Sequence, residues 1–336
     1  MTALQVSLAP MAGYTDWPFR RVCRQFGLHY ASTALIDAGA LVHANPDNDE
    51  ILHRGDDEPW LQVQLLGSIP ADIRQAVRLL REGKWRYDAL DFNMGCPVKK
   101  VLRRLAGAAL MRHPDLALEC VKIIRDEWPG TFTVKMRILD ESDPAPTVEL
   151  AESLYHVGIE GVTIHGRLTE RIYSGPVHGD VIRAVREAVP VPVTANGGIF
   201  SVADAQALAG ASGCERVMVA RGAIGNPWLF RELTEGQALP PPSPEEVLAC
   251  AERHLAWMMD EYGERAAMIL GRKILSSYIC GRGFPHALRA AVVRISTWQE
   301  AQELLTSLRR AKTESGDTVC GVPAQGGIVD NPTAII

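Results

Sequence analysis

The chain has 336 residues, of which 47% are hydrophobic and 22% are charged, and its formal net charge is −5. This length fits one large domain, or a large domain followed by a smaller one, and the composition is that of an ordinary globular protein. The net charge does not indicate a nucleic-acid binder, so such a function must depend on local clusters of charge.

Several classes of protein are disfavoured by the same inspection. No uninterrupted apolar run is long enough to cross a bilayer, and residues 1–5 lack the features that begin a signal peptide. The seven cysteines are scattered, odd in number and contain no Cys-x-x-Cys pair. That pattern argues against a zinc site or a disulfide framework and favours the reducing cytoplasm. No His, Asp or Glu cluster has ligand spacing, so we expect no metal.

The first two thirds of the chain repeat one pattern, in which a short apolar run ends in polar or glycine residues and an amphipathic stretch follows. The apolar runs are 7–11, 29–35, 60–67, 89–95, 131–137, 161–166, 191–198 and 216–222. Strands that alternate with helices indicate parallel pairing, and eight such units predict a (β/α)₈ barrel over residues 1–236. A doubly wound open sheet is the alternative, but no Gly-x-Gly-x-x-Gly turn follows the first run.

The remainder of the chain reads differently. Residues 237–244 are proline-rich and predict a stiff linker, after which Ser243 resembles a helix N-cap with Glu245 and Glu246 in the first turn. The helical pattern then continues to residue 311, which predicts a small all-helical domain over 245–311. Residues 312–336 are rich in glycine and proline without periodicity, and we expect a loose tail there.

The fourth strand end contains the most informative stretch, residues 91–100, with the sequence Asp-Phe-Asn-Met-Gly-Cys-Pro-Val-Lys-Lys. Cys96 lies between glycine and proline, so we expect it on a turn at the mouth of the barrel, where active sites of this fold lie. The alternative is a buried structural cysteine, because free cysteine is among the most buried residue types. Lys99 and Lys100 follow at once and suit an anionic ligand.

Other strand ends predict a site for a flat cofactor that carries a phosphate. Glycines that follow strands seven and eight, in Asn196-Gly197-Gly198 and Arg221-Gly222, lie where barrel enzymes bind phosphate. Lys135 suits the electron-rich edge of a flavin ring, and Gln64 supplies a donor and an acceptor for the same edge. His165 ends the neighbouring sixth strand; a lone histidine there is more often structural.

Two basic runs indicate a local surface for RNA despite the negative net charge. Residues 99–112 contain five basic residues and 265–294 contain six, and neither run contains an acidic residue. Tyr278, Phe284 and His286 are interleaved with the second run and are of the type that stacks on bases or riboses. Solvated helix faces are the alternative for both runs, whereas two such runs favour a groove that follows a phosphate backbone.

Taken together, these segments strongly resemble the tRNA-dihydrouridine synthase family, whose members are FMN-dependent (β/α)₈ enzymes with a C-terminal helical domain. The resemblance runs in order through residues 9–16, 93–100, 107–111, 134–137, 165–167, 196–198 and 220–228. The Asn-Met-Gly-Cys-Pro run followed by Lys-Lys is its most specific part, whereas Ala-Pro-Met at 9–11 is shared more widely among flavin barrels.

The resemblance implies a role for each matching residue. Cys96 corresponds to the general acid that protonates C5 of uracil while reduced FMN delivers hydride from N5 to C6, and Asn93 to a residue that holds the flipped-out base. The implied FMN contacts are Pro10, Met11, Ala12, Gln64, Lys135, His165, Asn196, Gly197, Gly198, Ala220, Arg221 and Gly222. The two basic runs add Lys99, Lys100, Arg272 and Lys273 as expected tRNA contacts. NADPH or NADH is the implied reductant, and neither a membrane nor an obligatory protein partner is indicated.

The sequence departs from the family pattern in two places, and two other functions remain open. Residues 32–35 read Ser-Thr-Ala-Leu where many relatives have a glutamate, with Asp37 nearby, and residues 138–143 are unusually acidic. The first alternative is a flavin barrel that reduces a free pyrimidine or another small molecule, which leaves the basic helical segment unexplained. The second is a catalytically inactive RNA-binding protein, against which the set Cys96, Lys135 and His165 argues.

Overall fold

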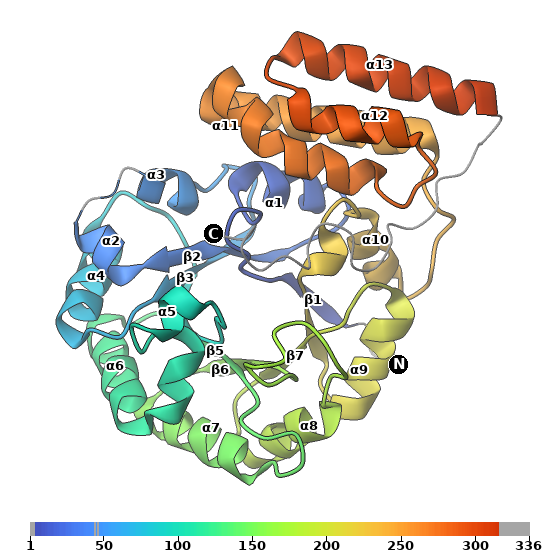
Figure 1. Ribbon diagram of the computed structural model, residues 1–336. Coiled ribbons are helices and arrows are strands. Elements are labelled where there is room, and N and C mark those ends of the chain that lie inside the picture. The colour runs from blue at the N-terminus through green and yellow to red at the C-terminus, as the bar shows by residue number, and fades with distance from the viewer. Residues whose placement is uncertain (1–3, 44, 46, 316–336) are drawn as a thin grey trace.

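The computed structural model describes residues 4–43, 45 and 47–315, and in this part of the chain eight parallel strands close into a barrel (Figure 1). The strands are β1 (Gln5–Leu8), β2 (Tyr30–Asp37), β3 (Trp60–Leu66), β4 (Ala89–Met94), β5 (Thr131–Arg137), β6 (Gly161–His165), β7 (Val193–Asn196) and β8 (Arg216–Val219). Each strand pairs with the next in the sequence, and β1 pairs with β8, which closes the ring. The predicted barrel is therefore confirmed, and the open sheet is excluded.

Helices form a layer around the strands (Figure 1). They are α1 (Trp17–Arg24), α2 (Ala38–Val42), α3 (Asp47–Leu52), α4 (Pro70–Glu82), α5 (Lys99–Leu102), α6 (Pro114–Glu127), α7 (Ala145–Val157), α8 (Gly179–Ala188), α9 (Val202–Ser212) and α10 (Trp228–Glu235), with short 3₁₀ helices η1 (Gly107–Arg112) and η2 (Arg221–Ala223). All six residues of β4 are buried, as expected for a parallel strand covered on both faces.

The first strand ends earlier than its apolar run, which extends to residue 11. Pro10 has no backbone N–H to donate to a neighbouring strand, and the N–H of Met11 donates to the hydroxyl of Thr15 at 2.8 Å. That hydroxyl in turn donates to the carbonyl oxygen of Ala9 at 2.9 Å. Residues 9–11 therefore form a fixed turn that brings Pro10 and Met11 to the barrel mouth.

A second group of helices follows the barrel and consists of α11 (Pro244–Ile279), α12 (His286–Ala291), η3 (Val292–Arg294) and α13 (Trp298–Ser315). Ser243 caps α11 as predicted, because its hydroxyl accepts from the N–H of Glu246 and the Glu246 side chain accepts from the N–H of Ser243. Gly263 interrupts α11 with φ 73° and ψ 160°, a backbone conformation that glycine adopts without steric cost.

The predicted tail begins too early, because α13 continues through residues 312–315. Lys312 is only 4% exposed, and its ammonium lies 5.3 Å from the ring centre of Phe284. This packing holds the last turn of the helix against the group. Residues 316–336, the rest of that prediction, lie outside the described residues.

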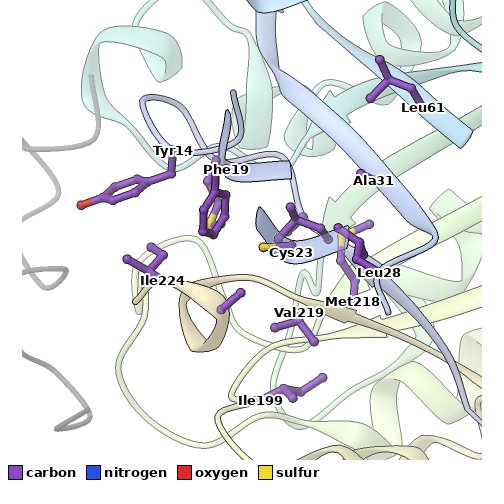
Figure 2. Packing of buried hydrophobic residues seen from close by; sticks show 14 of the residues in the cluster. Tyr14, Phe19, Cys23, Leu28, Ala31, Leu61, Ile199, Met218, Val219 and Ile224 are labelled. Carbon is purple, nitrogen blue, oxygen red and sulfur yellow. The ribbon is translucent and has the colours of Figure 1, made fainter. Parts of the chain in front are cut away.

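The helical group packs on the barrel beside α1 and α10 (Figure 1). Phe19 of α1 stacks on His254 of α11 with ring centres 5.8 Å apart, and the hydroxyl of Tyr262 donates to Asp16 at 3.0 Å. Figure 2 shows Phe19 and Cys23 within a buried cluster that also contains Leu28 and Val219. One continuous core thus joins the barrel to the helical group.

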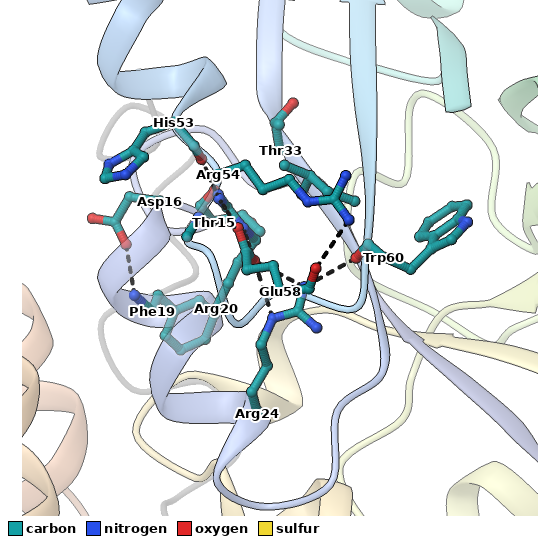
Figure 3. Close-up of polar contacts among 12 residues, drawn as sticks. Thr15, Asp16, Phe19, Arg20, Arg24, Thr33, His53, Arg54, Glu58 and Trp60 are labelled. Carbon is teal, nitrogen blue, oxygen red and sulfur yellow. Dashed lines mark hydrogen bonds and ion pairs between the residues drawn. The ribbon is translucent and has the colours of Figure 1, made fainter. Parts of the chain in front are cut away.

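A buried ion cluster fixes α1 to the loop before β3 (Figure 3). Both carboxylate oxygens of Glu58 accept from Arg20 at 2.9 Å, and Arg24 donates to the same carboxylate at 2.8 Å. The side chains of Arg20 and Glu58 are fully buried. The turn at residues 9–15 leads directly into this anchored helix, and Arg20 also donates to the carbonyl oxygen of Thr15 at 3.2 Å, so the cluster supports the mouth of the barrel.

Candidate active site

A cavity of about 410 Å³ opens at the carboxyl ends of the strands. Its lining comes from the ends of seven of the eight strands and from the loops that follow them. The strand-end and loop residues that line it include Ala9–Ala12, Tyr14, Leu35, Asp37, Leu66, Asn93, Cys96, Lys100, Arg104, Lys135, Arg137, His165, Arg167, Tyr173, Asn196–Phe200 and Ala220–Gly222. The barrel therefore brings most of the predicted site residues to one place.

Cys96 is a free, half-buried thiol on the turn after β4. The N–H groups of Gly95 and Cys96 both donate to the Asn93 side-chain oxygen, at 3.1 and 2.9 Å, which holds the turn in shape. Burial raises the pKa of the Cys96 thiol, although the N–H of Val98 and the charges of Arg137 and Lys135 act in the opposite direction. The sulfur is therefore protonated at neutral pH and is equipped to give up a proton.

The 3₁₀ helix η1 closes against the back of this turn. Gly107 has φ +59°, and a Cβ there would meet the Cys96 carbonyl oxygen at 2.8 Å and the Val101 side chain at 2.9 Å. The next residue, Ala108, donates its N–H to that carbonyl at 3.1 Å. Only glycine lets η1 lie this close to the Cys96 turn. This contact accounts for the glycine with which the segment 107–111 begins.

Two cavity residues on β5 and β6 are held by polar contacts. The ammonium of Lys135 donates to the Asn196 side chain at 2.9 Å, and burial followed by the charge of Arg137 lowers the Lys135 pKa to about 8. Arg167 donates to Nε2 of His165 at 3.4 Å, so the imidazole proton lies on Nδ1. Burial and three neighbouring arginines together with Lys135 keep the His165 pKa well below its ordinary value, so the ring is neutral.

The glycines after β7 and β8 form a narrow cradle. A Cβ on Gly222 would lie 2.2 Å from the carbonyl oxygen of Ile199, and Gly197 and Gly198 have φ of +122° and +69°. Arg221 lies over the ring of Tyr173 at 4.3 Å from its centre. At the cradle, glycine backbone without covering side chains therefore lies beside the guanidinium of Arg221. This arrangement suits a phosphate group.

The predicted site residues separate into those that line the cavity and those that do not. Every predicted cofactor residue except Gln64 lines it, together with Asn93, Cys96 and Lys100. Gln64 is fully buried and lies behind Asn93, whose amide donates to it at 2.7 Å. Lys99 is exposed on α5 and does not line the cavity.

Arg272 and Lys273 lie on α11 and differ in environment. The ammonium of Lys273 lies 4.6 Å from the ring centre of Tyr14, which lines the cavity, and close to Gly13. Arg272 instead donates to the carbonyl oxygen of Ile295 at 2.9 Å and holds η3 in place. Of these two residues, Lys273 borders the mouth of the barrel and Arg272 does not.

Part of the predicted aromatic and basic groove is wrong. Tyr278 is fully buried, with its hydroxyl 3.3 Å from Nδ1 of His254, and Phe284 is 3% exposed. Arg282 is 1% exposed and donates to the carbonyl oxygen of Gly225 at 3.2 Å. Tyr278 lies on the buried face of α11, and Arg282 and Phe284 are buried in the turn that follows this helix. A run of residue types does not reveal this burial.

The two departures from the family pattern have local partners. Asp37 pairs with Arg104 at 2.5 Å and caps α2 through the N–H of Ala40. Leu35, the last residue of the segment 32–35, lines the cavity. In the acidic loop, Glu141 pairs with Arg171 at 2.9 Å, so at least one of its charges is balanced by the loop after β6.

Several cavity residues were not assigned a role from the sequence. Arg137 donates to the carbonyl oxygens of Gly95 and Leu168, at 2.8 and 3.1 Å, and is 2% exposed. Its place two residues after Lys135 gave a signal, since alternate strand residues share a face. Tyr173 gave none, because it lies in an irregular loop without periodicity.

The fold and the cavity define a class of protein, a (β/α)₈ barrel whose mouth combines a protonated thiol with a cationic cradle. A likeness to the solved structure of histamine dehydrogenase from Rhizobium sp. 4-9, with a TM-score of 0.51 and 16% identity, agrees in fold alone. That match covers 75% of this chain and 48% of the longer dehydrogenase chain. No helix among residues 4–43, 45 and 47–315 is long and apolar enough to cross a membrane.

The particular family follows from sequence comparison. The family profile described as Dihydrouridine synthase (Dus) matches residues 7–314, and the chain belongs to this family. The tRNA-dihydrouridine synthase B of Proteus vulgaris is 34% identical over 275 residues, which are 81% of this chain and 84% of that protein. The protein of the same name from Pseudomonas aeruginosa is 32% identical over 322 residues, 94% of this chain and 95% of the relative.

Proposed function

We propose that this protein is a tRNA-dihydrouridine synthase, a flavin-dependent oxidoreductase that reduces the C5=C6 bond of uridines in tRNA. Membership of the dihydrouridine synthase family supports the reaction. The observation that carries the proposal is the placement of the Cys96 thiol in the same cavity as Lys135 and the glycine cradle. A proton donor beside a cationic cofactor site is the combination that this reduction requires.

FMN is the cofactor that we propose for the cavity. Its phosphate fits the cradle of Gly198, Arg221 and Gly222, where two glycines leave the backbone uncovered beside a guanidinium, and its ring fits beside Lys135. When bound, FMN supplies the hydride that the reaction adds to uracil. NADPH or NADH is the proposed source of electrons.

The residues of the chain supply the proton and the position of the base. Cys96 gives its proton to C5 as negative charge develops on the uracil, and Asn93 holds the turn that aims the sulfur. A base inside a stacked loop cannot reach the bottom of this cavity, so the uridine must turn out of its stack. We propose the cytoplasm as the compartment, because substrate tRNA and reduced nicotinamide are both available there.

We propose that tRNA contacts the mouth of the barrel and extends toward the helical group over residues 245–311. Lys100 lines the cavity, and Lys273 stands at its border on α11, so one phosphate backbone can pass both. Lys99 is exposed beside Lys100 and is proposed as a further phosphate contact. Arg272 contributes by holding η3, a change from the direct contact that the sequence predicted.

Charge reversal at the border of the cavity tests this placement of tRNA. Lys273→Glu is expected to weaken tRNA affinity about tenfold near physiological salt and to lower the salt dependence of binding by about one counterion. Filter binding over a range of salt concentrations measures both. Lys122→Glu, on the outer helix α6, is the matched control and is expected to bind like the unchanged protein. Equal affinity of the Lys273 variant would contradict the placement.

The ionisation of Lys135 gives a second test, this time of the cofactor site. Its pKa of about 8 means that the ammonium is charged at pH 7 and loses its proton as the pH rises above 8. Because the charged form attracts the anionic cofactor, we expect FMN affinity to fall between pH 7 and pH 9. Quenching of flavin fluorescence on addition to protein stripped of flavin measures this. Lys135→Met is expected to bind FMN more weakly at pH 7 and to show no fall in FMN affinity between pH 7 and pH 9. If the fall persisted in this variant, a group other than Lys135 would be responsible for it.

The proposed function itself is tested by following NADPH oxidation in the presence and absence of unmodified tRNA transcript. We expect the purified protein to release FMN on denaturation and to oxidise NADPH faster with tRNA present. A flavoprotein that is indifferent to tRNA but responds to free pyrimidines would be a small-molecule reductase. A colourless protein that binds tRNA would be an inactive RNA-binding protein.

A further inference from the structure

A buried carboxylate lies below the active-site turn and takes no part in the chemistry described above. Asp91 of β4 is 3% exposed and faces the interior of the barrel. Its Oδ2 accepts from the Gln64 amide at 2.6 Å, and its Oδ1 accepts from the Thr133 hydroxyl at 2.5 Å. Burial of a carboxylate costs free energy unless hydrogen bonds compensate, so its presence here calls for a reason.

The contacts form a chain from this carboxylate to the Cys96 turn. Gln64 donates to Asp91, Asn93 donates to Gln64 at 2.7 Å, and the N–H groups of Gly95 and Cys96 donate to Asn93. Each amide in the chain thus accepts on one side and donates on the other. We call this chain, Asp91–Gln64–Asn93, the amide relay.

The orientation of the relay is fixed from the end at the turn. Backbone N–H groups can only donate, so the Asn93 atom that faces Cys96 must be its oxygen. The Asn93 NH₂ group then faces Gln64, which must present its own oxygen and direct its NH₂ group at residue 91.

The same orientation is fixed independently from the other end. The Thr133 hydroxyl accepts from the Gln62 amide at 2.6 Å, so its proton points to Asp91. Asp91 therefore meets two donors, and an ionised carboxylate is the group that accepts from both. Burial raises the pKa of Asp91 to about 6, while the hydrogen bonds from Gln64 and Thr133 and the charge of Lys135 on the neighbouring strand act in the opposite direction. The carboxylate is therefore mostly ionised at neutral pH.

We propose that Asp91 is a positioning residue, which sets the orientation of the Gln64 and Asn93 amides and so holds the Cys96 turn in the shape that presents the thiol. The role of the presented thiol rests on the proposed function; the orientation of the relay does not. Asp91 is not among the residues that line the cavity, so the carboxylate acts through two amides.

Hydrogen–deuterium exchange at Gly95 and Cys96 reports the relay directly, because Asn93 accepts from those two amides. In Asp91→Asn, residue 91 can turn either its oxygen or its nitrogen to Gln64, so the orientation is no longer imposed. We expect exchange at Gly95 and Cys96 to become about tenfold faster, the effect of weakening a hydrogen bond to a charged group. Exchange in β7 should stay unchanged, and exchange at Gly95 and Cys96 should also stay unchanged in the control Asp88→Asn, which alters a carboxylate just before the same strand that contacts Leu61.

A second variant separates orientation from general packing. Asp91→Asn combined with Gln64→Glu moves the carboxylate one step along the relay, where it still accepts from Asn93 and from the new amide at 91. The double variant is expected to restore slow exchange to within about twofold, a coupling that a merely structural role would not give. Gln64→Met interrupts the relay at its middle, and exchange at Gly95 and Cys96 is expected to be as fast in this variant as in Asp91→Asn. It provides an independent test of the relay if Asp91→Asn folds poorly.

Slow exchange at Gly95 and Cys96 in both Asp91→Asn and Gln64→Met would overturn the proposal, and so would a double variant that stays fast. In tRNA reduction, Asp91→Asn is expected to lower kcat about tenfold at an unchanged KM for tRNA, and the double variant to recover most of it. If the unchanged protein does not reduce tRNA, the proposed function fails, while the exchange data still decide the relay.

Discussion

Cys96→Ala is expected to retain bound flavin and to lose at least about 100-fold in the rate of tRNA reduction, the usual contribution of a positioned general acid. The thiol is half-buried and protonated, and it lies in the cavity with the proposed flavin residues. It packs against a small cluster of Leu66, Val101 and Ala106 that is separate from the main core. Its removal therefore takes away the proton donor and leaves the cofactor site intact. Single-turnover reduction of tRNA by the prereduced protein measures the loss.

Cys280→Ala is the matched control for that experiment, because Cys280 is also half-buried but follows α11 outside the cavity. It is expected to reduce tRNA at the unchanged rate. Persistence of near-normal turnover in Cys96→Ala would remove Cys96 from the role of general acid and would direct attention to solvent or to another group as the proton source.

Glu58→Gln is expected to lower the free energy of unfolding by about 3–5 kcal/mol, the cost of breaking a buried ion pair on one side. Glu58 satisfies Arg20 and Arg24 at once, and the Arg20 side chain is fully buried, so the variant leaves an uncompensated charge. Urea denaturation of the two proteins at the same pH measures the difference.

The pH dependence of this cluster has a definite sign. Burial acts to raise the pKa of Glu58, but hydrogen bonds and charges from Arg20 and Arg24 outweigh burial and hold that pKa below its ordinary value. Its contribution is therefore complete above the unfolded-state pKa and is lost as the pH falls through the folded-state pKa. Glu127→Gln is the control, because the arginines Arg74 and Arg78 that bind Glu127 are exposed; it should destabilise far less. An equal loss in both variants would contradict the account.

The sequence predicted the site where the barrel rule applies. Once eight strands are recognised, Lys135, Cys96 and Gly198 must gather at one mouth, since every strand ends there. The structure places all three on the same cavity. The positions of these residues along the chain are enough for this prediction, because all strands of a parallel barrel end at the same mouth.

The remaining features depend on contacts between distant segments, which spacing does not describe. The residue types of Tyr278 and Arg282 suit an RNA surface, but Tyr278 lies on the buried face of α11 and Arg282 is buried in the turn that follows it. Gln64 has the residue type of a cofactor ligand but is turned toward Asp91 and Asn93 by hydrogen bonds that need β3 and β4 in register. Tyr173 reaches the cavity through an irregular loop. In each case the sequence does not show which distant residue a side chain contacts.

The most direct test is position-resolved mass mapping of dihydrouridine in unmodified tRNA incubated with the purified protein, FMN and NADPH. The proposed function predicts product at a defined uridine, absent when Cys96→Ala replaces the unchanged protein. Oxidation of NADPH by a flavin-loaded protein with no mass change anywhere in the tRNA would contradict it and would favour a reductase of small molecules.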